Sequence, residues 1–327
     1  MTRASTVPRR TAWAAAVVLA VIVLACLAAP LYAGHVAHTD AFASNVSGST
    51  VVDGQVVPVL QPMTEGLGLG VVPIGPTGDP RHYLLGADGQ GRDVAARLLF
   101  GGRLSLGIAA GATVLCAVIA VPLGLLAGYV GGALDAIVSR ALDLVWAFPV
   151  YLLTVSLSVV LLAGEARLGP VHLGAGSLAV PVAVIALGYV PYVALPLRAQ
   201  ARAVRETDYV RLARALGASH LHVLRRHLLP AALPSLVAVL PVLAALSLLA
   251  EAALSFLSVG VQSPRASWGT VLNDGLALLY TRPAVTVAPG LLIVSTAVCL
   301  NLLADAARNA ADPSRPGPAV ASRVEHG

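Results

Sequence analysis

Residues 104–129 read LSLGIAAGATVLCAVIAVPLGLLAGY and contain no charged side chain. As an α-helix this run is about 39 Å long, which exceeds the roughly 30 Å thickness of the hydrocarbon core of a bilayer. Lipid offers no hydrogen-bond partner to the backbone, so a segment that crosses it must be helical. The run therefore predicts a transmembrane helix.

Five other apolar runs have the length that a transmembrane helix needs. They lie at 12–33, 144–163, 177–197, 234–258 and 286–306. The run at 144–163 is the weakest, because Asp135, Arg140 and Asp143 precede it closely. Of the 327 residues, 57% are apolar and 11% are charged, whereas roughly 25% of residues are charged in soluble domains. We expect an all-α integral membrane protein with six transmembrane helices and exclude a soluble enzyme.

The composition also excludes several kinds of chemistry. All 21 basic residues are arginine, so the chain lacks the lysine of a phosphate-binding loop and the amine of a Schiff base. The cysteines, Cys26, Cys116 and Cys299, lie in apolar runs and form no CxxC pair. We therefore expect no catalytic residue, no metal and no bound cofactor in this chain, and no nucleic-acid partner.

The distribution of arginine predicts the topology. With a cytoplasmic N-terminus, fourteen arginines fall on the inner side and seven on the outer side, as the positive-inside rule requires. The expected divisions are a cytoplasmic N-terminus (1–11), a first helix (12–33), an irregular extracytoplasmic loop (34–101), a five-helix core (102–307) with a cytoplasmic loop at 198–233, and a cytoplasmic tail (308–327).

The loop at 198–233 carries seven arginines. Burying them in lipid would cost on the order of 20 kcal/mol at roughly 3 kcal/mol each, so the loop lies outside the membrane. Apolar residues at helical spacing predict one apolar face: Tyr209, Leu212, Ala213 and Leu216. Asp208 is placed to cap this helix, and Gly217 to end it in a left-handed conformation. Ser219 is placed to cap a second short helix that precedes Pro230.

Two interpretations of this loop stay open from the residues alone. It is either a solvated basic loop that only enforces topology or a docking surface for a cytoplasmic partner. An apolar face between two helix caps favours docking.

The spacing within the loop resembles the signature of permeases in ATP-driven, binding-protein-dependent importers. That signature is Glu-Ala-Ala, three residues, Gly, nine residues, Ile, one residue, Leu-Pro. Here it falls on Arg211-Leu212-Ala213, Gly217 and His227-Leu228-Leu229-Pro230. The sequence departs from it at Arg211, Leu212 and His227, and arginine at the first position is usual in the dipeptide/oligopeptide/nickel branch.

Other stretches are similar to the same branch. LGADGQGRD (85–93) with RLLFG (97–101) resembles the segment before its second helix, and EAALSFL (251–257) resembles its late signature. GVQ (260–262), SWG (267–269) and NLLAD (301–305) continue the match. The resemblance covers about 84–313 and leaves out 34–80.

This resemblance implies the type I ABC importer permease fold in a bacterial plasma membrane. The implied partners are a second homologous permease, two cytoplasmic ATPase subunits that bind ATP and Mg, and an extracytoplasmic substrate-binding protein. The residues that would couple to the ATPase are Asp208, Tyr209, Arg211, Leu212, Ala213, Leu216, Gly217, Leu229 and Pro230.

Two residues are candidates for the translocation path. Glu251 is an acid inside a predicted span, which is by default a functional hypothesis; the alternative is a packing role. Trp268 lies in the following outer loop, where an anchor at the membrane interface is the favoured alternative.

The substrate stays open at this stage. Di- or oligopeptides are expected, and nickel complexes or other small solutes are the alternative. A proton-coupled secondary transporter is less favoured, because such carriers show internal repeats and midplane carboxylates, whereas this chain has one intramembrane acid and no repeat.

Overall fold

Long α-helices dominate the structure, a computed structural model that describes residues 8–52, 54–63, 70–163, 166–168, 171–173 and 176–311. This agrees with the predicted all-α membrane fold. The longest helices are α1 (Arg9–Leu27), α3 (Val94–Val130), α6 (Ala179–Arg205), α9 (Leu229–Phe256) and α11 (Ala284–Ala311). Each contains or overlaps one predicted span, and in the described residues these five are long and apolar enough to cross a membrane.

The sixth predicted span is broken. It corresponds to α4 (Gly132–Trp146) and α5 (Val150–Ala163), which meet at an angle of 89°. Pro149 stands at the break; proline cannot donate to the helix ladder and disfavours helical backbone in the residue before it. The straight helix predicted over 144–163 is therefore interrupted, and the pair counts as one span only in bent form.

The segment between the first two long helices is more ordered than the irregular loop predicted at 34–101. α1 continues into α2 (Ala29–Leu31) and a π-helical turn, η1 (Tyr32–Val36). Two antiparallel hairpins follow, and their strands are β1 (Ser49–Val52), β2 (Gln55–Pro58), β3 (Leu60–Pro62) and β4 (Val71–Pro73). A small apolar cluster supports them: Val59, Ile74, Tyr83 and Ala87.

Another antiparallel pair lies elsewhere in the chain, between α5 and α6. It joins β5 (Ala166–Leu168) to β6 (Val171–Leu173).

α3 begins at Val94, before residue 102 where the sequence placed the start of the core. The Asp93 carboxylate caps it by accepting hydrogen bonds from the Ala95 and Ala96 N–H groups, at 2.8 and 3.2 Å. Such a cap satisfies backbone donors that the first helical turn leaves free. The helix can therefore start among polar residues, ahead of the apolar run.

α3 packs most extensively against α6. A Cβ atom added at Gly124 would lie 2.6 Å from the Ala194 carbonyl oxygen, and one at Gly128 would lie 2.3 Å from that of Arg198. Both distances are too short for a real side chain. The two glycines thus let the backbones of the helices touch, as small residues do between membrane helices.

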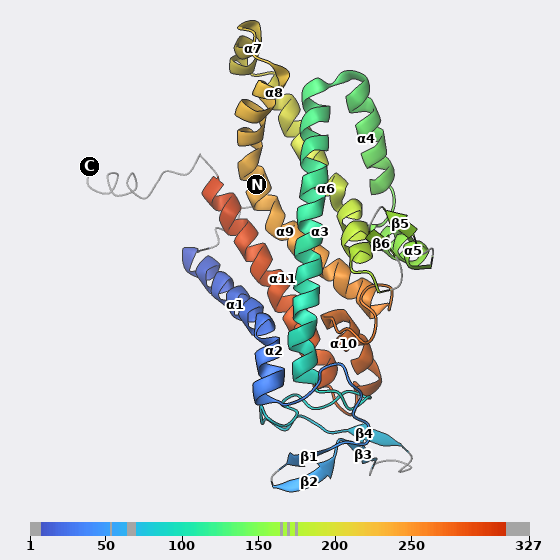
Figure 1. Cartoon of the computed structure of the whole chain (residues 1–327). Helices are drawn as coiled ribbons and strands as arrows, with labels where there is room; N and C mark the ends of the chain where they lie inside the picture. Colours follow the sequence, from blue (N-terminus) through green and yellow to red (C-terminus); the bar gives the residue numbers. More distant parts are fainter. Residues whose placement is uncertain are drawn as a thin grey trace, which may run out of the picture.

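The remaining helices lie at the two ends of the bundle (Figure 1). α7 (Asp208–Ala215) and α8 (His220–Val223) protrude at one end, the loop end, and the hairpins β1–β4 lie at the opposite, hairpin end. Near the hairpin end, α10 (Trp268–Gly275) and a 3₁₀ turn, η3 (Leu276–Leu278), connect α9 to α11.

The sequence predicted a separate second helix in the loop, and this prediction is wrong. α8 passes through a π-helical turn, η2 (Leu224–Leu228), directly into α9. Pro230 lies in the first turn of α9, where its missing N–H is tolerated. The helical path therefore runs on from His220 to Phe256.

We predict that Gly128→Ala loosens the α3–α6 contact. Its Cβ would meet the Arg198 carbonyl oxygen, and overpacking of this kind costs about 1–3 kcal/mol. Thermal unfolding in mild detergent should show a lower midpoint. Gly107→Ala is the control, because its Cβ meets no atom within 4 Å; equal midpoints for the two variants would contradict the prediction.

Candidate functional site

α7 carries most of the residues that the sequence singles out, and its start differs from the prediction. Thr207 is the N-cap residue, and its hydroxyl donates to the Val204 carbonyl oxygen at 2.6 Å instead of capping α7. Asp208 is the first helical residue, so its predicted role as N-cap is wrong. Its negative charge still lies in the first turn of α7, where it interacts favourably with the positive end of the helix dipole.

The end of α7 is as predicted at Gly217. This residue has φ of +89°, a left-handed conformation that glycine adopts at little cost. The Gly217 N–H donates to the Arg214 carbonyl oxygen, and the Ala218 N–H to that of Ala213, both at 3.0 Å. These two bonds form a Schellman motif. The Ser219 hydroxyl then accepts from the His222 N–H at 3.2 Å, which confirms the predicted cap of α8.

The loop has a buried side and an exposed side. Val210 and Val223 have no exposed surface and belong to the main apolar core. In contrast, Tyr209, Leu212 and Leu216 are 50%, 61% and 80% exposed. We call these three residues the α7 face. Of the other predicted coupling residues, Ala213 is half-buried, and the exposed ones are Asp208, Arg211, Gly217, Leu229 and Pro230.

Polar contacts fasten the base of the loop to α3. The Arg205 guanidinium donates to the carbonyl oxygens of Tyr129 and Val130, at 3.1 and 3.3 Å, and so caps the C-terminus of α3. The Tyr129 hydroxyl lies 3.0 Å from His220 Nδ1. These contacts join the ends of α3 and α6 to the start of α8.

The chemistry of the α7 face suits protein contact and not catalysis. Its apolar side chains are accompanied by exposed arginines: Arg211, Arg214, Arg225 and Arg226. Within the described residues, no group of three or more histidine, cysteine or acidic side chains could hold a metal ion. Apolar side chains with a basic rim would fit a groove whose edges are acidic.

The structure brings the two translocation-path candidates, Glu251 and Trp268, together around Ser105 of α3. Glu251 Oε1 accepts a hydrogen bond from the Ser255 hydroxyl at 2.7 Å, and the Ser105 hydroxyl also lies beside this carboxyl group. The Trp268 backbone N–H donates to Ser105 Oγ at 3.1 Å, and the indole N–H to the Leu98 carbonyl oxygen at 3.0 Å.

Neither Glu251 nor Trp268 has exposed surface. They therefore line no opening in the conformation described. An interfacial anchor, the alternative favoured for Trp268, exposes its ring to lipid headgroups, and complete burial does not fit that role. In this structure both residues join α9 and α10 to α3.

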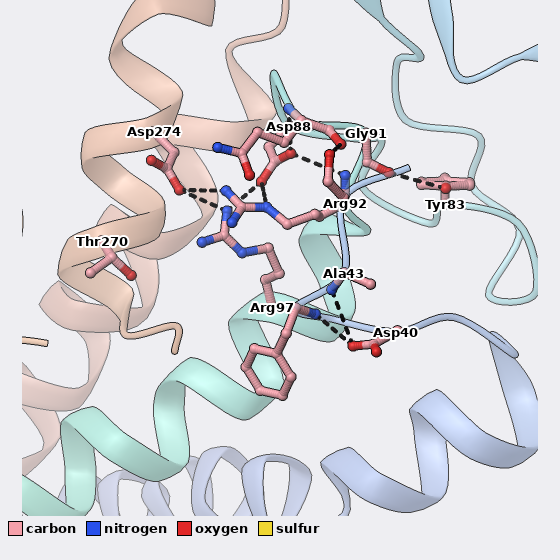
Figure 2. A network of polar contacts seen from close by, with 12 residues as sticks. Asp40, Ala43, Tyr83, Asp88, Gly91, Arg92, Arg97, Thr270 and Asp274 are labelled. Atoms are coloured by element: carbon pink, nitrogen blue, oxygen red, sulfur yellow. Dashed lines mark hydrogen bonds and ion pairs between the residues drawn. The ribbon is translucent and has the colours of Figure 1, made fainter. Parts of the chain in front are cut away.

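A second polar feature lies at the hairpin end, where two buried arginines share two aspartates (Figure 2). Arg92 Nε donates to Asp88 Oδ2 at 2.8 Å, and its Nη2 donates to Asp274 Oδ2 at 3.0 Å. Arg97 Nη1 bonds the same two carboxylates, at 2.8 Å to Asp274. Both arginines and Asp88 are buried. The network ties the start of α3 to α10.

Asp88, Arg92 and Arg97 lie in a stretch that resembles the family, but the sequence predicts no role for them. Their partner Asp274 is 177 residues or more away in the chain, so no local spacing reveals the pair. The available signal is that two arginines and an aspartate stand next to a long apolar run. Charges at such a place must be paired when they are buried.

Comparison with known proteins identifies relatives of the chain. Residues 120–315 match the family described as binding-protein-dependent transport system inner membrane component. A protein of Brucella suis biovar 1 (strain 1330), provisionally named a peptide transport system permease protein, is 37% identical over 232 residues, which cover 71% of this chain and 74% of that protein. The glutathione transport system permease protein GsiD of Pectobacterium atrosepticum is 33% identical over 236 residues, covering 72% and 74%.

A solved structure is also similar. It is described as an inward-facing conformation of the methionine ABC transporter MetNI, and the matched chain is 20% identical with a TM-score of 0.52. The match covers 66% of this chain and 96% of the other. This likeness shows a shared fold.

We predict that Asp88→Asn destabilises the protein by about 3–5 kcal/mol, the usual cost of leaving a buried charge unpaired. Asparagine keeps the acceptor for the Gln90 and Arg92 N–H groups but loses the charge and the oxygen that accepts from the two guanidinium groups. Thermal unfolding in detergent is the measurement. Asp79→Asn, which alters an exposed pair with His82, should have little effect; equal losses in the two variants would refute the prediction.

Proposed function

Since the chain belongs to the family of binding-protein-dependent transport system inner membrane components, we propose that it imports di- or oligopeptides and couples to an ATPase through the α7 face. The chain is a permease subunit of an ABC importer and not an enzyme, and ATP hydrolysis occurs in separate subunits. A substrate-binding protein and an ATPase are its functional partners.

The observation that carries the coupling proposal is the exposure of the α7 face. Three large apolar side chains stay open to the surroundings although α7 is held firmly at both ends. A helix that only connected two spans would have no need to present them. In this proposal the face binds a groove of the ATPase, and Arg205 and His220 pass the closure of that groove to α3 and α6.

The assembly we propose contains a second homologous permease, two cytoplasmic ATPase subunits that hold ATP and Mg, and an extracytoplasmic binding protein. In support, a single chain leaves apolar side chains of its long helices exposed, among them Val114 and Val118 of α3. Lipid and a second permease together would cover such a surface.

We also propose that the loop end faces the cytoplasm of a bacterium and that both termini lie there. The arginine distribution supports this orientation, since cytoplasmic loops carry the excess of basic residues. ATP is also available on that side, as a docked ATPase requires.

The peptide substrate rests on the relatives, which are named for peptide and glutathione transport. Because glutathione is itself a small peptide, both names agree on the chemical class. Nickel complexes and other small solutes are the alternative, and no feature of the described residues favours them.

The function can be tested by purifying the tagged chain in mild detergent and identifying its companions by mass spectrometry. A second permease and ATPase subunits should co-purify, and uptake of labelled dipeptide into vesicles with the binding protein should require ATP and survive an uncoupler. Recovery of the chain alone, with uptake that collapses under the uncoupler, would instead indicate a proton-coupled carrier.

We predict that Gly217→Asp uncouples transport from ATP hydrolysis while membrane insertion stays normal. Aspartate and asparagine are among the residues that adopt this left-handed conformation, so the expected effect comes mainly from the negative charge that the acid adds beside the α7 face. Gly217→Asn is the control, because asparagine tolerates the same conformation and is uncharged. Peptide uptake and ATPase activity would be measured together in proteoliposomes. Normal peptide uptake by the Gly217→Asp variant would contradict the coupling proposal.

A further inference from the structure

A groove of about 450 Å³ lies on the side of the bundle between α1, α3, α9 and α11. Its walls are apolar or small side chains, such as Leu19, Val23, Gly107 and Leu248, and its lining includes one charged residue, Arg103. Neither the α7 face nor the buried network at Asp88 contributes to it. The groove is therefore separate from the features already described.

The length of the groove matches one leaflet of a bilayer. On α1 its lining runs from Leu19 to Leu27, which is about 12 Å of helix at 1.5 Å per residue. One leaflet contributes roughly 15 Å of hydrocarbon, half of the 30 Å core. The groove thus offers a path for one acyl chain, and Gly107 leaves room for it because no atom lies within 4 Å of a Cβ added there.

Arg103 stands at the hairpin end of this groove, next to the apolar run that begins at residue 104. Its side chain is exposed, and its guanidinium carbon lies 5.9 Å from the centre of the Phe100 ring. Among the residues that the structure describes, no carboxylate pairs with it. An arginine at the edge of the apolar run extends toward the headgroup layer, where lipid phosphates lie.

We propose that the groove binds an anionic phospholipid from the leaflet at the hairpin end, with an acyl chain along α1 and α3 and the phosphate on Arg103. Guanidinium groups recognise phosphate by paired, charge-assisted hydrogen bonds. A helix of the second permease is a poorer occupant, because it would have to bring an acidic side chain to the same depth to satisfy Arg103.

Native mass spectrometry of the purified, assembled transporter tests this proposal. Phosphatidylglycerol and phosphatidylethanolamine with the same acyl chains would be titrated separately. We expect wild type to prefer phosphatidylglycerol and Arg103→Gln to bind it about tenfold more weakly, a factor equivalent to about 1.4 kcal/mol. Arg81→Gln, an equal charge change at an exposed site of the same end, should bind like wild type.

A second pair of variants tests the acyl-chain path. Gly107→Leu fills the groove and should weaken binding of both lipids, whereas Val114→Leu, on an exposed position of the same helix outside the groove lining, should not. Unchanged phosphatidylglycerol binding in Arg103→Gln would overturn the proposal. So would an oxidant-induced disulfide between a cysteine at Ala110 and a cysteine introduced into the second permease, since that would place a protein segment in the groove.

Discussion

The close contact of α3 with α6 at Gly124 and Gly128 is the constraint on which the rest of the structure depends. Water drives no association of apolar helices inside lipid, so packing and buried polar contacts must hold them. Because the two backbones touch, the end of α6 reaches the end of α3, and Arg205 can cap it. The loop at 206–219 therefore begins at a fixed junction between the ends of α3 and α6.

This fixed junction explains why α7 can be anchored on one side and exposed on the other. Val210 and Val223 are buried against the bundle, while Leu212 and Leu216 point away from it. The Schellman motif at Gly217 turns the chain without using any side chain of the α7 face. An ATPase groove that closes on this face would thus act on α3 and α6 through a few short, directed contacts and not through a flexible tether.

The sequence predicts best what depends on local composition. Long apolar runs located the helices, and Gly217 and Ser219 marked the turn, because each effect acts within a few residues. Asp208 was misplaced as a cap by one residue: Thr207 takes the N-cap position, although Thr ranks below Asp as an N-cap and its hydroxyl bonds Val204. The sequence marks the break at Pro149 but not the 89° angle between α4 and α5. The pairing of Arg92 and Arg97 with Asp274 depends on the whole fold, so spacing could not reveal it.

The glycines of α3 show why residue type alone does not decide function. Gly124 and Gly128 face α6, where a Cβ would strike a carbonyl oxygen, and they serve close packing. Gly107 belongs to the same helix, but a Cβ there meets empty space. Among the described residues of this chain, no packing contact accounts for a small residue at this position. Among the described residues no carboxylate pairs with Arg103 beside that space, so a ligand explains it better, and in a bilayer the ligand always present is lipid.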